Sequence, residues 1–177
     1  MGAAIVNQVA VVQHQRLTSP APIRGGHNVT RFDCGEPSLN LWLEKHALIA
    51  ATMRTANTFV VCRGRRVVGY FSLANGAVDH NKTTAKIRRN TPDPIPATVL
   101  ARLAVHNAEK EQGLGRDLLI DASRRILAAA KHSAARLVVV HPLNTTAAAF
   151  YEKFGFRPLR GDTTAMFIAL ATLADGL

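Results

Sequence analysis

The sequence predicts a single α/β domain built on a mixed β-sheet. The chain has 177 residues, which fits one domain with a full hydrophobic core. Its residues are 47% hydrophobic and 19% charged, which is ordinary for a globular protein and too apolar for a disordered one. Segments with strand character alternate with segments of helical spacing along the chain. The expected order is helix, hairpin, strand, helix, strand, helix, strand.

A helix followed by a β-hairpin is expected in the first half of the chain. Ser38 is a suitable N-cap for a helix over about 38–50, where apolar residues recur at near-helical spacing. Thr58–Cys62 and Val67–Ala74 are rich in β-branched and apolar residues. We therefore expect two paired strands joined by a turn at Arg63–Arg66.

Three further strands and one exposed loop are expected downstream. Asp79–Thr91 is polar and basic, so it predicts an exposed loop, and Pro92–Pro96 is expected to lie outside helices and strand interiors. Val99–Val105 has strand character. Leu137–Val140 is a continuous apolar run, which predicts a strand buried on both faces. Met166–Leu170 is expected to form the last strand.

Two helices are expected in the second half. Gly113–Gly115 opens the first, and its apolar positions run from Leu118 to Ala130 on a face that should belong to the core. Thr145 or Thr146 is expected to cap the second helix, and Gly155 to end it.

Positive charge is the strongest signal in the composition. Lysine and arginine number 22 against 12 acidic residues, a net charge of +10. A small domain this basic attracts polyanions, such as nucleic acid, an anionic cofactor or an acidic protein. A plain solubility surface is the alternative interpretation.

Several other classes of protein are excluded or disfavoured. Two cysteines, Cys34 and Cys62, are too few for a disulfide scaffold or a four-cysteine zinc site, and they are expected to be reduced core residues. Seven histidines show no paired spacing, so no metal is expected. The chain lacks a membrane-length apolar run and a signal-peptide pattern, so we expect a cytoplasmic protein with no membrane partner. Residues 1–17 are expected to be a tail or irregular extension ahead of a domain over 18–175.

The segment Lys110-Glu111-Gln112-Gly113-Leu114-Gly115-Arg116 has the pattern of an anion site. A strand feeds a glycine loop that opens a helix, and the N–H groups of a first helical turn have no partner within the helix. The spacing matches neither a P-loop nor the dinucleotide fingerprint. A tight turn that needs small residues remains the alternative.

A cluster of aromatic residues follows the Leu137–Val140 strand. Phe150 and Phe154 share a helix face at spacing i,i+4, and Phe154 and Phe156 are expected in the core. Tyr151 lies beside them, either as a core residue with a polar outlet for its hydroxyl or as a functional group.

Together these segments resemble the GCN5-related N-acetyltransferase (GNAT) family. The matching residues are Arg102–Val105, the loop 110–116, and Asn144 followed by Phe150-Tyr151 and Gly155-Phe156. Upstream pieces extend the likeness over about 18–170 to the TacT/AtaT-type acetyltransferase toxins; these pieces are Phe32-x-Cys34-Gly35, Leu39-x-x-Trp42-Leu43, Thr58-Phe59-Val60, Tyr70-x-Ser72-Leu73-Ala74 and Arg89–Pro96. Lys110 departs from the family pattern, which has Arg or Gln there.

The resemblance implies a fold, a cofactor and a set of site residues. The fold is a single-domain GNAT fold with a mixed, mostly antiparallel sheet flanked by helices, in which splayed central strands hold acetyl-CoA. Tyr151 is the implied general acid. The implied acetyl-CoA-binding residues are Leu103, Ala104, Val105, Lys110, Gln112, Gly113, Leu114, Gly115, Arg116, Asn144 and Phe150.

The resemblance also implies a function and partners. The protein would be the toxin of a type II toxin–antitoxin system, transferring acetyl from acetyl-CoA to the α-amino group of aminoacyl-tRNA and blocking translation. The implied partners are aminoacyl-tRNA, a ribbon-helix-helix antitoxin and a second copy of the chain. The expected tRNA contacts are Arg65, Arg66, Lys86, Arg88 and Arg89. The alternatives are an acetyltransferase of small amines or protein N-termini, and a catalytically inactive binding module.

Overall fold

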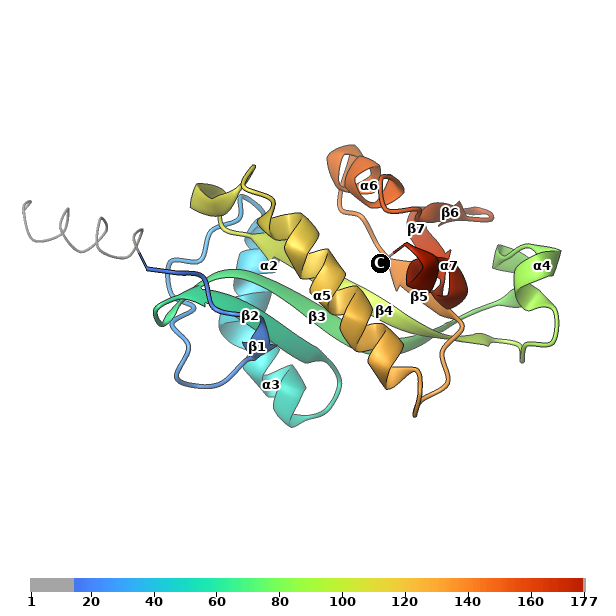
Figure 1. Cartoon of the computed structure of the whole chain (residues 1–177), viewed down its shortest axis with the longest axis horizontal. Coiled ribbons are helices and arrows are strands. Elements are labelled where there is room, and N and C mark those ends of the chain that lie inside the picture. The colour runs from blue at the N-terminus through green and yellow to red at the C-terminus, as the bar shows by residue number, and fades with distance from the viewer. Residues whose placement is uncertain (1–14, 177) are drawn as a thin grey trace, which may run out of the picture. The chain divides into compact units, whose positions relative to one another are not determined.

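The computed structural model describes residues 15–176, and within them seven strands form one sheet in the order β1-β2-β3-β4-β5-β7-β6 (Figure 1). The strands are β1 (Ala21–Pro22), β2 (Asn57–Arg63), β3 (Arg66–Val78), β4 (Ile95–Val105), β5 (Leu137–Val140), β6 (Arg157–Leu159) and β7 (Asp162–Ala169). β4 and β5 are parallel, whereas β1–β2, β5–β7 and β6–β7 are antiparallel. The expected mixed, mostly antiparallel sheet is confirmed.

The helical elements lie between these strands in the chain. They are α2 (Pro37–Leu41), the π-helical turn η1 (Trp42–His46), α3 (Ala47–Thr52), η2 (His80–Lys82), α4 (Ala85–Arg88), η3 (Asn107–Glu109), α5 (Leu114–Ala129), α6 (Thr145–Glu152) and α7 (Leu170–Asp175). No helix within residues 15–176 combines the length and apolar character that crossing a bilayer requires.

The chain packs as two units, and strands β3 and β4 contribute residues to both. Unit 1 contains residues up to Ser72 together with Leu103–Leu118, and unit 2 contains Leu73–Arg102 together with the residues from Leu119 onward. Each unit has its own cluster of buried apolar side chains. The two are described separately below.

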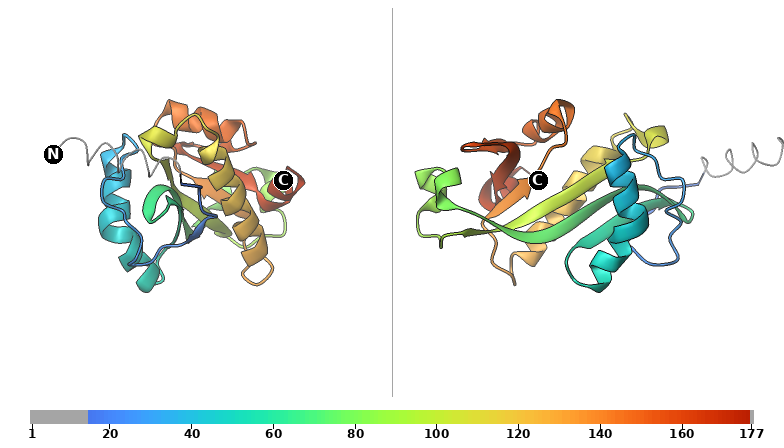
Figure 2. Two further views of the ribbon diagram at one scale, coloured as in Figure 1. Left: turned by 60° about the vertical axis from the view of Figure 1, so that its left-hand side comes forward. Right: turned by 180° about the vertical axis from the view of Figure 1, so that it is seen from behind.

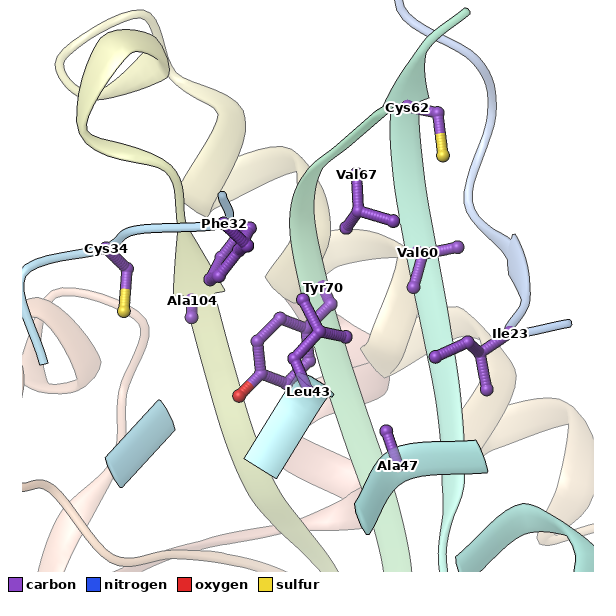
Figure 3. Close-up of a cluster of buried hydrophobic side chains, with 10 residues drawn as sticks. All are labelled: Ile23, Phe32, Cys34, Leu43, Ala47, Val60, Cys62, Val67, Tyr70 and Ala104. Carbon is purple, nitrogen blue, oxygen red and sulfur yellow. The ribbon is translucent and has the colours of Figure 1, made fainter. Parts of the chain in front are cut away.

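In unit 1, the helical segment α2–η1–α3 covers one face of β2 and β3 (Figure 2). Leu43 and Ala47 on that segment pack against Val60 on β2 and Tyr70 on β3 (Figure 3). The Tyr70 hydroxyl satisfies its hydrogen-bonding need by donating to the carbonyl of Leu39 over 2.8 Å. The predicted helix and hairpin are confirmed, and both cysteines are buried and free.

The predicted start of the first helix is wrong. Ser38 lies inside the helix, because Glu36 is the N-cap and Pro37 occupies the first turn. Proline fits there because the first helical N–H has no partner in any case, and its fixed φ is already helical. The preference for Pro at that position therefore decides where this helix begins.

In unit 2, β5 is the buried centre of a small sheet. Leu137–Val140 pair in parallel with Ala97–Leu100 and antiparallel with Met166–Ala169. All four β5 residues are buried, as the continuous apolar run predicts. The apolar cluster here joins Ile95 and Leu137 to side chains from β3, β6 and β7.

The prediction of a plain exposed loop over 79–91 is wrong, because η2 and α4 form within it. The Thr83 side chain is buried, and its hydroxyl donates to the carbonyl of His80. The proline-rich segment also differs from expectation. β4 begins at Ile95, so Pro96 is its second residue, and the carbonyl of Pro96 accepts a hydrogen bond from the N–H of Arg136 over 2.8 Å. A proline lacks only the donor, so it is tolerated at a strand's start.

The second predicted cap is also wrong. Asn144, and neither of the two threonines, is the N-cap of α6, with its Oδ1 accepting from the N–H of Ala147 over 2.8 Å. Gly155 ends the helical segment with φ +86°, as expected.

Candidate active site

The loop between β4 and α5 is the first part of the candidate site and lies in unit 1. The N–H of His106 bonds to the carbonyl of Val68 on β3, and the His106 side chain then caps η3 by accepting from the N–H of Ala108. Glu111 and Gly113 both have positive φ, +64° and +84°. These left-handed residues turn the chain sharply between η3 and the start of α5.

Two charged side chains tie this loop to the rest of unit 1. Glu109 accepts two hydrogen bonds from Arg63, at 2.6 Å from Nε and 2.9 Å from Nη2, with side-chain exposures of 7% and 17%. This carboxylate raises the pKa of the Arg63 guanidinium. The Lys110 ammonium donates to the carbonyl of Cys34 over 2.7 Å. The predicted ligand Lys110 therefore already donates one hydrogen bond within the protein.

Helix α5 approaches β3 closely at Gly69. A Cβ atom built there would lie 3.1 Å from the Leu118 side chain and 3.2 Å from that of Leu114. Gly69 thus permits the first turns of α5 to pack directly on the strand, which fixes where the helix begins in unit 1.

The residues at the start of α5 suit a phosphate group. The N–H of Asp117 is the first to bond back into the helix, to the carbonyl of Gly113, so the preceding N–H groups point out of its N-terminus. Nothing lies within 4 Å of the Cβ position at Gly113, and Arg116 is exposed. Gln112 is exposed and donates to the carbonyl of Ala108. Leu114 is buried and Gly115 partly buried, so these two would contribute backbone atoms only.

The last residues of β4 extend past the end of β5. The parallel pairing stops at Leu100 opposite Val140, whereas β4 continues to Val105. Leu103 and Val105 are half-buried and Ala104 is buried. The peptide groups of Leu103–Val105 therefore extend beyond the β5 pairing.

Tyr151 is the central side chain of the second part of the site, in unit 2. It lies on α6, is 7% exposed, and has the rings of Phe150 and Phe156 at centroid distances of 5.2 and 5.4 Å, both edge-on. Burial in this aromatic surrounding raises the pKa of the Tyr151 phenol. The group therefore stays protonated at neutral pH, as a proton donor must.

Two other predicted ligands belong to the same helical segment, Asn144 as the N-cap of α6 and Phe150 within it. Asn144 is exposed, and its Oδ1 is engaged in capping α6, which leaves the amide Nδ2 pointing away from that bond. Phe150 is half-buried and also contacts Phe154 at 5.1 Å. Phe156 is in the core, as expected, whereas Phe154 is only partly buried.

The predicted tRNA contacts fall into two groups. In unit 2, Lys86 and Arg88 lie on α4 and Arg89 follows it, and all three are exposed. In unit 1, Arg65 donates through two nitrogens to the carbonyl of Gly26, and Arg66 lies against the His106 ring at 2.8 Å.

Sequence reasoning missed Glu109 and Gly69, and it did not assign the structural roles of Arg63 and Asn144. Glu109 and Arg63 pair across 46 positions, which local patterns cannot reveal. Gly69 carried a usable signal, since a lone glycine inside an apolar strand often marks a close approach. Asn144 carried one as well, because Asn precedes Thr145 and is itself a strong N-cap.

The candidate site thus has two features, a glycine loop at the N-terminus of α5 in unit 1 and a buried tyrosine on α6 in unit 2. The family model of the acetyltransferase (GNAT) domain matches residues 54–158. The chain belongs to the GNAT acetyltransferase family.

Its relatives include bacterial toxins. A tRNA-acetylating toxin of Mycobacterium tuberculosis (strain ATCC 25618 / H37Rv) is 43% identical over 139 residues, which cover 78% of this chain and 84% of the relative. A probable toxin TacT of Sinorhizobium fredii (strain NBRC 101917 / NGR234) is 23% identical over 158 residues, covering 83% and 87%.

Solved structures of similar fold belong to the same group. AtaT complexed with acetyl-methionyl-tRNAfMet matches with a TM-score of 0.83 and 27% identity over 90% of this chain and 98% of that one. AtaTR bound with acetyl-CoA matches with a TM-score of 0.79 and 28% identity, covering 89% and 96%. A mutant of KacT matches with a TM-score of 0.85 over 92% of this chain and 100% of that one; its identity is 24%, so this likeness concerns the fold.

Proposed function

We propose that this chain is a toxin of a type II toxin–antitoxin system that transfers acetyl from acetyl-CoA to the α-amino group of aminoacyl-tRNA and so blocks translation. The observation that carries the proposal is 43% identity, over most of both chains, to a tRNA-acetylating toxin. The acetyltransferase domain spans 18–175, with residues 1–17 as an extension, of which 1–14 lie outside the described residues. Within the described residues, Thr18 bonds to Cys62, and Leu17 forms a bridge with Arg63 just before it.

Acetyl-CoA binding is assigned to unit 1 and to α6. The peptide groups of Leu103–Val105 would pair with the pantetheine arm as a further strand does, and one of their N–H groups would polarise the thioester carbonyl. Loop N–H groups of Gln112–Arg116 would hold the pyrophosphate, with the exposed Arg116 adding charge. Lys110 acts mainly by anchoring the loop to Cys34. Asn144 and Phe150 would contact the pantetheine, and no metal takes part.

Tyr151 is the proposed general acid. The amine nitrogen attacks the thioester carbonyl carbon, the carbon–sulfur bond breaks, and the departing thiolate takes the phenol proton of Tyr151. The ammonium proton of the acceptor leaves to water. An α-amine with a pKa of about 8 is uncharged in roughly a tenth of its molecules at pH 7, so a reactive fraction is present without a strong protein base.

The proposed macromolecular partners follow from the relatives and from the charge. Lys86, Arg88 and Arg89 would contact tRNA phosphates, and exposed residues on a short helix reach such contacts without reading bases. Similar proteins were solved with tRNA and with the C-terminus of an antitoxin. The cytoplasmic partners proposed here are aminoacyl-tRNA, a ribbon-helix-helix antitoxin and a second copy of this chain.

Acceptor choice tests the proposed function. The purified full chain is mixed with radiolabelled acetyl-CoA and, in separate reactions, with charged tRNA, deacylated tRNA or free amino acid. We expect label on charged tRNA alone. Equal labelling of free amino acid would show instead an acetyltransferase of small amines, and saturable acetyl-CoA binding without any labelling would show a binding module.

A further inference from the structure

Six basic side chains gather on unit 1. They come from the segment 24–31, from the β2–β3 turn and its edge, and from the end of β4. We call them the unit 1 basic surface: Arg24, His27, Arg31, Arg65, Arg66 and His106. The residues of segment 24–31 carry no acidic side chain, and the turn 64–66 carries none either.

The backbone beneath this surface is firmly held. The N–H of Asn28 donates to the carbonyl of Arg65 over 2.7 Å, and the N–H of Val67 donates to the carbonyl of Asn28 over 2.9 Å. Arg65 returns two hydrogen bonds to Gly26, at 3.0 and 3.1 Å. Segment 24–31 and the turn therefore form one unit, and their cationic groups are pre-arranged before any ligand arrives.

Arg66 lacks good acceptors in this arrangement. Within residues 15–176 its buried Nε has no hydrogen-bond partner. Its Nη2 faces Nε2 of His106 at 2.8 Å, but His106 already accepts at Nδ1 from Ala108, so in the neutral ring Nε2 carries the hydrogen. That hydrogen points to the carbonyl of Arg31 at 3.3 Å. Nη2 of Arg66 therefore lies against another donor and not against an acceptor, so this contact does not neutralise the Arg66 charge.

Nearby carboxylates offset the charge of this surface only in part. Glu109 is paired with Arg63, whereas Asp33, which accepts from the N–H of Gly35 and from Asn40, keeps its negative charge near His106. The arginine charges contribute to lowered pKa values of the two histidines of this surface. Burial first, and then the charges of Arg24 and Arg65, lower the pKa of His27. Burial and then Arg66 lower the pKa of His106 against weaker opposing effects of the Arg31 carbonyl, Asp33 and Glu109.

We propose that the unit 1 basic surface binds the sugar–phosphate backbone of the tRNA substrate. The inference rests on the proposed function and adds segment 24–31, which no sequence motif singled out. Guanidinium groups form charge-assisted bonds to phosphate oxygens. Segment 24–31 offers no phenylalanine, tyrosine or tryptophan on which a base would stack. The surface therefore positions RNA without selecting its sequence.

Binding of deacylated tRNA at several salt concentrations tests this surface independently of acetyl transfer. The test variant is Arg24→Gln with Arg31→Gln, both exposed arginines. Its matched control is Arg124→Gln with Arg54→Gln, because Arg54 is exposed and has φ +57°, close to the +66° of Arg31. Steady-state kinetics with charged tRNA and acetyl-CoA and a thermal unfolding curve accompany both variants.

For the test variant we expect the tRNA Kd to rise about tenfold and the slope of log K against log salt to flatten by about two. The KM for acetyl-CoA should stay unchanged, and the control should keep the wild-type Kd. An equal loss in both variants, or an unchanged salt slope in the test variant, would overturn the proposal. If wild type binds tRNA through this surface but transfers no acetyl group to it, the proposed function fails and the surface stands.

Discussion

Aromatic neighbours bury the Tyr151 phenol and raise its pKa. Its ring lies edge-on to Phe150 and Phe156 and is almost fully buried. Removing a phenol from water disfavours the phenolate, so burial raises the pKa of Tyr151. The proton stays on the oxygen until negative charge develops on the departing sulfur. The residue type was evident from the sequence, whereas the aromatic packing that raises the pKa of the phenol is seen only in the fold.

Glu109 is expected to act on acetyl-CoA binding through the loop that it anchors. Changing Glu109→Gln removes the carboxylate that holds Arg63 and frees the loop 110–113 to sample other conformations. Because a less pre-organised loop binds more weakly, the KM for acetyl-CoA should rise about tenfold. The kcat and the KM for charged tRNA should change little. Steady-state kinetics with each substrate varied in turn measure this split.

The Arg125–Asp121 pair provides the control for that variant. Its Nε–Oδ2 distance is also 2.6 Å, but it lies on α5 as an i,i+4 pair. Asp121→Asn breaks an ion pair of the same Nε–O distance outside the loop and should leave the KM for acetyl-CoA unchanged. A positioning role for Glu109 is contradicted if the two variants raise that KM equally, or if Glu109→Gln lowers only the Tm.

At the scale of elements, the stability of helix α6 depends on its N-cap residue, Asn144. Asn144→Ala removes the side-chain acceptor of the Ala147 N–H and should lower the free energy of unfolding by about 1 kcal/mol. Asn144→Asp keeps an acceptor and adds favourable charge at the helix N-terminus, so stability should return. Both variants lack the Nδ2 donor, so both should raise the KM for acetyl-CoA, although the Asp variant is stable. Urea unfolding and kinetics of both variants decide the matter; an Ala variant as stable as wild type would exclude the capping role.

The elements that the sequence predicted well are those with long, regular apolar patterns. The hairpin, the buried strand Leu137–Val140 and helix α5 all follow from such patterns. Short elements were missed, because β6, α4 and α7 have three to six residues and depend on neighbours that lie far away in sequence. The helix starts were misplaced because several capping residues stand side by side, and only the folded chain selects one of them.

The sequence indicated the residue types of the candidate site, but not the long-range contacts that hold them in place. The glycine loop stands out in the sequence by its pattern and Tyr151 by the family resemblance, and their roles in catalysis stay predictions. The anchoring bond from Lys110 to Cys34 spans 76 positions, and no local pattern reports it. Arg63 had looked like one more basic turn residue, yet its guanidinium is occupied by Glu109.

At the scale of the whole molecule, the net charge of +10 should make stability fall in mild acid. The folded state lowers the pKa of His27 and His106 below the ordinary 6.5, so the unfolded chain binds protons more readily. The free energy of unfolding is then greatest above pH 6.5 and decreases as the pH falls through the folded-state pKa values. Asp33 and Asp162, whose pKa values are also lowered, act in the same direction only at much lower pH.

Urea unfolding at pH 7.5 and pH 5.5 measures this decrease. His27→Gln should lose part of it, because one of the two groups no longer titrates. A polyanion bound to the unit 1 basic surface should reduce it further by stabilising the protonated histidines. Stability that is equal at the two pH values, or higher at pH 5.5, would contradict the account.

The most direct measurement of the central claim is the fate of labelled acetyl in the presence of charged tRNA. Wild type and Tyr151→Phe are each incubated with radiolabelled acetyl-CoA and charged tRNA, and the amino acid is then released by mild base. We predict labelled N-acetyl amino acid with wild type and a rate about 100-fold or more lower with the Phe variant, at an unchanged acetyl-CoA Kd. Equal rates from the two proteins, or label that remains on the RNA after the amino acid is released, would contradict it.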